Sequence, residues 1–240
     1  MIQFLSLDDA DSTLGLSPMV GAAEKLIAYL VEHNEIGLTP SKAFKRSFVN
    51  WAARAFEWPG YEEAELFSVN KVLNEQDLPP LEMLHYVLLQ LKLIRHYKGA
   101  CRLTKAGKAL VGKPGAIFDV IAPFYLFRVD HAAWSRTREP VLGNWGVFLN
   151  ILNVEAAHGV SGGDLREIFY GPPDPADPYD HMPGMLWSQV LRPLCWLGLL
   201  ADQTVEKFQH FEDRLYATTP LWRAAFDLQT DAMIQKPRLH

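Results

Sequence analysis

The sequence predicts a mainly helical fold with short β-hairpins, built from two similar modules in tandem. Apolar residues recur at helical spacing through much of the 240-residue chain, and one helix-to-hairpin pattern occurs twice, beginning at Leu88 and again at Leu194. The composition, 49% hydrophobic and 21% charged, is typical of a globular protein long enough for two cores. We expect a first module over 17–113, a connecting helix and linker over 114–141, and a second module over 142–230.

The repeated pattern is an apolar helix, a pair of aliphatic residues, a polar turn and a closing threonine. The first copy runs from Leu88 through Lys98-Gly99 to Thr104, and the second runs from Leu194 to Thr219-Pro220. Lys98-Gly99 suits a tight turn because glycine accepts positive φ. Threonine caps helix N-termini, so Thr104 and Thr219 predict helices over 105–111 and 220–228.

The repeat extends upstream of these segments. A predicted helix over 19–34 precedes Gly37-Leu38-Thr39, and one over 142–157 precedes Gly159-Val160-Ser161, at a constant offset of 122 residues. Further helices are expected over 40–56, 81–94 and 185–197, with an acidic, irregular segment over 57–80. Helix, short strand, helix, helix, hairpin is the winged-helix order, so we predict tandem winged-helix-like modules. Helical periodicity alone is the alternative explanation of the match.

Two resemblances accompany this pattern. The stretch Leu88–Leu110 resembles the third helix and wing of bacterial winged-helix regulators. The segments Gly37-Leu38-Thr39-Pro40, Phe48-Val49 and 103–110 are similar to the C-terminal region of uncharacterised proteins carried by bacterial plasmids and insertion elements. This similarity covers about 36–128 and, more faintly, 185–228. The first resemblance implies a winged-helix fold, and the second carries over no activity.

Charge is distributed unevenly. The net charge is −5, and residues 114–240 hold 10 Lys and Arg against 15 Asp and Glu, which excludes indiscriminate coating of nucleic acid. Residues 92–113 contain seven basic side chains and no acid. Basic residues where a wing touches a duplex supply phosphate contacts, which give affinity without sequence specificity. The candidate nucleic-acid-binding residues are Lys42, Lys45, Arg46, Arg95, Lys98, Arg102, Lys105 and Lys108. The alternative is an ordinary solvated hairpin.

The third helix of each module lacks the polar face that base reading requires. The first, over 81–94, offers Glu82, His85, Gln90 and Lys92 among apolar residues. Ser188, Gln189 and Arg192 are the polar residues of the second, over 185–197. A helix this apolar is expected to be mostly buried, which argues against sequence-specific recognition. The acidic second module is expected to bind a protein partner or a second copy of the chain.

Enzyme chemistry finds little support in the sequence. Two Glu-x-x-His pairs, Glu82 with His85 and Glu155 with His158, have the helical spacing of a di-iron ligand pair, but we expect exposed or capping side chains. Glycine-rich phosphate loops, HExxH and CxxC are absent. Cys101 lies beside basic residues that could activate its thiol, although packing is the expected role. We therefore expect no enzyme, no cofactor and no metal.

The sequence favours a non-enzymatic bacterial protein of the cytoplasm. Its apolar runs are too short to span a bilayer, and residues 1–16 lack the positive region of a signal peptide. The leading hypothesis is a transcription regulator or nucleic-acid-associated adaptor that contacts double-stranded DNA through the first module. A protein-interaction scaffold that has lost DNA binding is the first alternative. A helical metalloprotein using the Glu-x-x-His pairs is the second.

Overall fold

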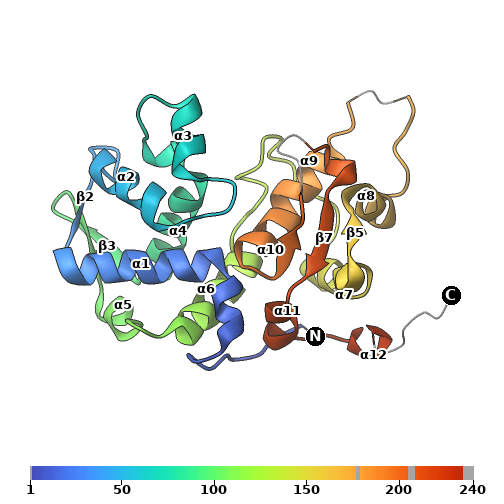
Figure 1. Ribbon diagram of the computed structural model, residues 1–240, viewed down its shortest axis with the longest axis horizontal. Coiled ribbons are helices and arrows are strands. Elements are labelled where there is room, and N and C mark those ends of the chain that lie inside the picture. Colours follow the sequence, from blue (N-terminus) through green and yellow to red (C-terminus); the bar gives the residue numbers. More distant parts are fainter. Residues whose placement is uncertain (1, 177–178, 205–208, 235–240) are drawn as a thin grey trace. The chain divides into compact units, whose positions relative to one another are not determined.

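Helices predominate in the computed structural model, which describes residues 2–176, 179–204 and 209–234 (Figure 1). Within these ranges the strands form small antiparallel sheets, so the predicted mainly helical fold with short hairpins is confirmed. The chain divides into two compact units. We call Ser6–Tyr125 the N-terminal unit, and Met1–Leu5 together with Leu126–His240 the C-terminal unit. The division falls inside α6 (Pro114–Arg128), the expected connecting helix.

The N-terminal unit places helices before and after a β-hairpin. Its elements are η1 (Ser12–Leu16), α1 (Pro18–His33), β2 (Ile36–Gly37), α2 (Arg46–Ala55), α3 (Glu63–Val69), η2 (Glu75–Asp77), α4 (Pro79–Gln90), β3 (Ile94–Tyr97), β4 (Ala100–Leu103) and α5 (Lys105–Ala109). The sheet order is β2-β4-β3. Helix, strand, helix, helix, hairpin follow one another as predicted, with α3 and η2 added before α4.

Local chemistry explains where these elements begin and end. Ser17 accepts a hydrogen bond from the Val20 N–H at the start of α1, where Pro18 needs no amide partner. The hairpin turn is Lys98-Gly99, with φ of 48° and 76°, which are the two positive values of a type I′ turn. Thr104 caps α5 by accepting from the Gly107 N–H, as predicted. That helix is shorter than expected and ends at Ala109.

Two sequence predictions for this unit are wrong. The helix expected over 40–56 begins only at Arg46, because residues 39–43 form a turn in which Lys42 has a φ of 68°. That turn is closed by the bridge between Leu38 and the buried Phe44. The segment 57–80, expected to be irregular, contains α3 and η2. Glu63 and Glu65 stabilise the first turn of α3, because acidic side chains favour the positive end of a helix dipole.

The C-terminal unit has the same order of elements. They are β1 (Gln3–Phe4), α7 (Trp145–Glu155), η3 (Ala156–His158), β5 (Val160–Ser161), α8 (Gly162–Tyr170), α9 (Met182–Leu186), the π-helical turn η4 (Trp187–Leu191), α10 (Arg192–Trp196), β6 (Leu200–Asp202), η5 (Phe211–Asp213), β7 (Leu215–Thr218), α11 (Pro220–Ala225), β8 (Phe226–Asp227) and α12 (Asp231–Ile234). Its three-stranded sheet has the order β5-β7-β6, and β1 pairs separately with β8.

The repeat is visible in backbone hydrogen bonds. The Leu93 N–H donates to the Leu88 carbonyl, and 106 residues later the Leu199 N–H donates to the Leu194 carbonyl, at 2.9 Å in both units. These bonds follow the end of α4 in the N-terminal unit and of α10 in the C-terminal unit. Each bond spans a left-handed residue, Lys92 or Gly198. Thr219 differs from its prediction. It precedes α11, which ends at Ala225, but its side chain makes no capping bond.

Among the described residues, none of the helices combines the length and the hydrophobicity of a membrane-spanning segment.

Candidate nucleic-acid interface

The β3–β4 hairpin gathers cations around one exposed aromatic ring. Arg95 lies directly opposite Arg102 in the strand register, and Tyr97 follows two residues later on the same face. The guanidinium carbons of Arg95 and Arg102 lie 5.5 and 5.4 Å from the centroid of the Tyr97 ring, and Lys98 Nζ lies 5.3 Å from it. Cation–π attraction therefore holds three of the predicted residues together at the hairpin.

Part of this positive charge is already neutralised. Arg102 Nε donates to a Glu35 carboxylate oxygen at 3.0 Å, in a half-exposed ion pair. Among the described residues, no carboxylate lies within ion-pair distance of Arg95 or Lys98. Like charges directly opposite one another destabilise a strand pair. The hairpin consequently has two exposed cations that an anion would stabilise.

The remaining predicted cations lie on two other segments of the N-terminal unit. Lys42 and Lys45 are exposed in the turn between β2 and α2, rather than on a helix as predicted. Arg46 begins α2, and its Nε donates to Asn74 Oδ1 at 3.0 Å. Lys105 and Lys108 are exposed on α5, the helix that follows β4. The structure thus brings Arg95, Lys98 and Arg102 together.

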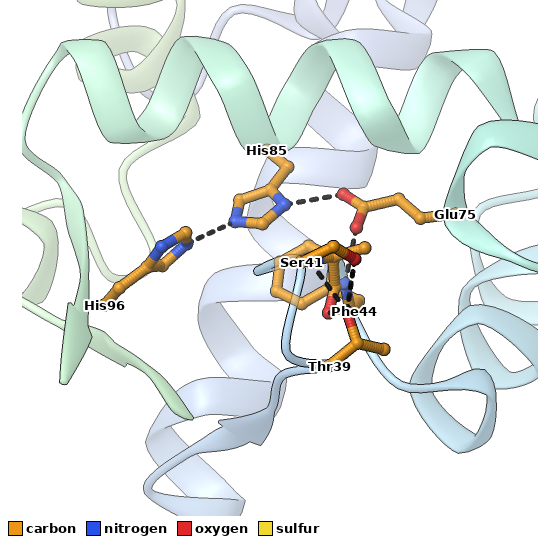
Figure 2. Close-up of polar contacts among 7 residues, drawn as sticks. Thr39, Ser41, Phe44, Glu75, His85 and His96 are labelled. Atoms are coloured by element: carbon orange, nitrogen blue, oxygen red, sulfur yellow. Dashed lines mark hydrogen bonds and ion pairs between the residues drawn. The ribbon is translucent and has the colours of Figure 1, made fainter. Parts of the chain in front are cut away.

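A buried polar chain lies between the β2–α2 turn and the hairpin (Figure 2). Glu75 of η2 is 4% exposed and His85 of α4 is 6% exposed. One Glu75 carboxylate oxygen accepts the Phe44 N–H, and the other accepts from His85 Nδ1, both at 2.5 Å. His85 Nε2 lies 2.9 Å from His96 Nε2 on β3. The Phe44 ring stacks on the His85 ring at 3.9 Å.

Sequence reasoning missed this polar chain of side chains. It placed His85 with Glu82 by helical spacing and expected exposed side chains, but His85 is buried and its carboxylate partner is Glu75, ten residues upstream. Glu75 lies in η2, just before Pro79 and Pro80 start α4. No spacing rule covers that arrangement. The other pair, Glu155 and His158, is exposed as expected.

The surroundings of the chain shift the neighbouring acid–base equilibria. Burial, together with the nearby Glu75 charge, raises the pKa of Cys101 to about 12. Its thiol is therefore not activated by the basic hairpin. Burial and then Glu75 raise the pKa of Glu82, which the positive charge of His85 opposes. Burial is the largest cause that lowers the pKa of His96.

The predicted third helix of each module is α4 in the N-terminal unit and the run of α9, η4 and α10 in the C-terminal unit. Both have little exposed surface with which to contact bases. On α4 the buried residues are Pro80, Leu81, Met83, Leu84, His85, Val87 and Leu88. In the C-terminal unit, Gln189 is 5% exposed. Its side chain accepts from the Val141 N–H at 2.9 Å and donates to the Glu139 carbonyl at 2.7 Å. The expected burial of both helices is confirmed, and Gln189 anchors the preceding segment instead of facing solvent.

A metal set does not accompany these histidines. In the described part of the chain, no three His, Cys, Asp or Glu side chains are grouped so that they could hold a metal ion. The C-terminal unit does have an open pocket with three carboxylates, Glu155, Asp164 and Glu167, beside Ile168 and Leu215. It belongs to the unit with the larger negative net charge.

A family of known proteins matches the chain in both units. Residues 15–116 match the Y4jL N-terminal domain, and residues 135–220 match the y4jL C-terminal domain. The uncharacterized protein y4jL of Sinorhizobium fredii (strain NBRC 101917 / NGR234) is 40% identical over 168 residues, which are 68% of this chain and 76% of that protein. The chain belongs to the Y4jL family. Its N-terminal Y4jL domain contains the hairpin and the Glu75–His85–His96 chain. No solved structure matches this Y4jL chain.

Proposed function

We propose that this Y4jL chain is a non-enzymatic protein with two winged-helix-like modules, which contacts the phosphates of double-stranded DNA through its N-terminal unit. The observation that carries the proposal is the hairpin, where Arg95 and Lys98 are exposed cations without a carboxylate partner among the described residues. Phosphate oxygens supply the negative charge that this face lacks. A regulator or an adaptor on DNA fits this mode of contact.

The buried third helices support binding that is indifferent to base sequence. Direct reading of a base pair needs polar side chains that reach into the major groove. The outward-facing residues of α4 are too few for this, since only Gln90 is fully exposed on that helix. Backbone contacts from the hairpin position a protein on a duplex without identifying its sequence.

The decisive experiment measures binding of a fluorescent duplex over a range of salt concentrations. We expect binding at low salt, similar affinity for unrelated duplexes, and a slope of log K against log salt that loses roughly 0.9 for each phosphate contact removed. The double variant Arg95→Glu with Lys98→Glu should abolish binding. Lys71→Glu, in the exposed loop after α3, is the matched control and should retain it. Absence of binding at low salt, or full binding by the double variant, would overturn the proposal.

A protein-interaction scaffold is the second candidate. It is favoured by the covered third helices and by the acidic pocket between α7, β5 and α8 in the C-terminal unit. Charge-lined surfaces of this kind select partners of opposite sign. The scaffold function predicts a stable complex or self-association in solution with no retention of nucleic acid. Substitution of Glu155, Asp164 and Glu167 by Gln should then dissociate the complex, whereas the DNA-binding function predicts no effect on duplex affinity.

A further inference from the structure

We propose that the contact between His85 and His96 is a proton-sensitive link that fastens the basic hairpin to the core of the N-terminal unit, and that protonation of both imidazoles releases the hairpin. The link is a property of the fold and can be tested without a ligand. Its consequence for DNA rests on the proposed function.

One carboxylate connects both basic segments. Glu75 accepts the Phe44 N–H, which fixes the turn that carries Lys42 and Lys45. The same carboxylate orients His85, and His85 contacts His96 of the hairpin (Figure 2). The chain therefore connects the β2–α2 turn, η2, α4 and β3. Breaking it at the His85–His96 contact removes this side-chain tie between β3 and α4, and leaves the turn in place.

The contact between His85 and His96 depends on the number of protons on the two rings. His85 Nδ1 donates to Glu75, so its Nε2 either accepts from or donates to His96 Nε2. A hydrogen bond between two nitrogens needs one proton. That condition holds when both rings are neutral and when either one is a cation. When both are cations, two N–H groups and two positive charges face each other at 2.9 Å, and the bond cannot form.

Charged and titratable groups face His96 from the elements packed around it. Burial is the largest cause that lowers the pKa of His96, His85 of α4 and Lys42 of the β2–α2 turn lower it further, and Glu75 of η2 raises it. Glu82 of α4 lies near Glu75 and His85, and Cys101 of β4 keeps its proton. His96 is therefore neutral at neutral pH, and the link opens on acidification, below the usual histidine value of about 6.5.

Release of the hairpin should be visible in amide hydrogen exchange. On lowering the pH from about 7.5 to about 5.5, after correction for intrinsic exchange, protection of the hairpin amides over residues 95–103 should fall about tenfold or more. His96→Gln should keep its protection at both values, because the glutamine amide donates to His85 Nε2 and does not titrate. His33→Gln, at an exposed histidine of α1, is the matched control and should retain the wild-type loss.

Two outcomes would sink the inference. One is equal protection of the wild-type hairpin at both pH values, and the other is an undiminished loss in His96→Gln. If that variant does not fold, NMR titration of the wild-type rings decides the question. The link requires His85 and His96 to titrate as a coupled pair and the Arg95–Leu103 amide signals to move with the second proton. Independent titration would contradict it.

Duplex affinity measured at the same two pH values distinguishes a failure of the link from a failure of the proposed function. Wild-type affinity for a duplex should fall between the same two pH values, because a released hairpin must be ordered again on binding, whereas the affinity of His96→Gln should not fall. Loss of hairpin protection without DNA binding at any pH would leave the link intact and reject the proposed function. Binding by the wild type with no pH-dependent exchange would reject the link alone.

Discussion

Thr104 and Thr219 occupy equivalent positions in the two units. The Thr104 hydroxyl donates to the Lys92 carbonyl at 2.7 Å, and the Thr219 hydroxyl donates to the Gly198 carbonyl at 2.6 Å. Each acceptor is the left-handed residue that ends the third helix of its unit. The backbone N–H of each threonine also donates to the residue after that acceptor, at 3.0 Å. The threonine thus joins the end of the third helix to the end of the return strand.

Replacing either threonine by valine should destabilise its unit. Thr219→Val loses one hydroxyl bond and should lower the free energy of unfolding by about 1 kcal/mol. Thr104→Val should lower it by about 1–2 kcal/mol, because Thr104 also accepts from the Gly107 N–H at the start of α5. Urea denaturation measures both values. Thr→Ser at each position keeps the hydroxyl and is the control. An equal loss in the serine variants would assign the effect to packing.

Much of this architecture could be predicted because repeats and turn chemistry are local. Lys98-Gly99, Thr104 and the aliphatic pairs each carry their signal within a few residues. Lys42 could not be placed in the same way, since its left-handed turn leads into Phe44, which is buried against His85, a residue far along the chain. The Glu75–His85 pair joins η2 to α4 through tertiary packing, so helical spacing pointed to Glu82 instead. The cations of the hairpin could be predicted from the sequence, but the ion pair in which Glu35 neutralises Arg102 could not.

Glycine 107 should tolerate no side chain. A Cβ on Gly107 would lie 2.2 Å from the Leu93 backbone oxygen, so Gly107→Ala must displace α5 from the start of β3. We expect a loss of about 2–4 kcal/mol in the free energy of unfolding. Gly21→Ala is the control, because that position in α1 has open space and an ordinary φ. It should stabilise the protein by about 0.5–1 kcal/mol. Similar values for the two variants would contradict the close approach.

Glu75→Gln should lower the free energy of unfolding, although it removes only one charge. The Phe44 N–H and His85 Nδ1 contact different carboxylate oxygens, and an amide has an acceptor at only one of these two positions. Either the Phe44 N–H loses its acceptor, or His85 changes tautomer and loses its charge-assisted bond to a carboxylate. The expected loss is about 1–3 kcal/mol, measured by chemical denaturation. Glu57→Gln, whose carboxylate is 80% exposed and paired with Lys25, should lose no more than about 0.5 kcal/mol. A negligible cost at Glu75 would show that its two bonds contribute little.

Gln189→Leu should detach the segment that precedes α7 from the third helix of the C-terminal unit. The variant loses the bonds to Val141 and Glu139, and leaves that amide and carbonyl unpaired. We expect trypsin to cleave after the exposed Arg136 and Arg138 several times faster than in the wild type, since cleavage follows local opening. Gln90→Leu, at an exposed position of α4, is the control. Unchanged cleavage would show that apolar packing alone holds the segment.

The pairing of β1 with β8 has a consequence for the order in which the protein can assemble on the ribosome. Gln3 and Phe4 pair with Asp227 and Phe226, although they are synthesised before the whole of the N-terminal unit. Residues 6–125 can complete their core while the partners of Gln3 and Phe4 have not yet been translated. The C-terminal unit can close only when the last strand emerges. A fragment cut at residue 126 would therefore be missing a strand, and expression of the C-terminal unit alone requires residues 1–5 to be fused back onto it.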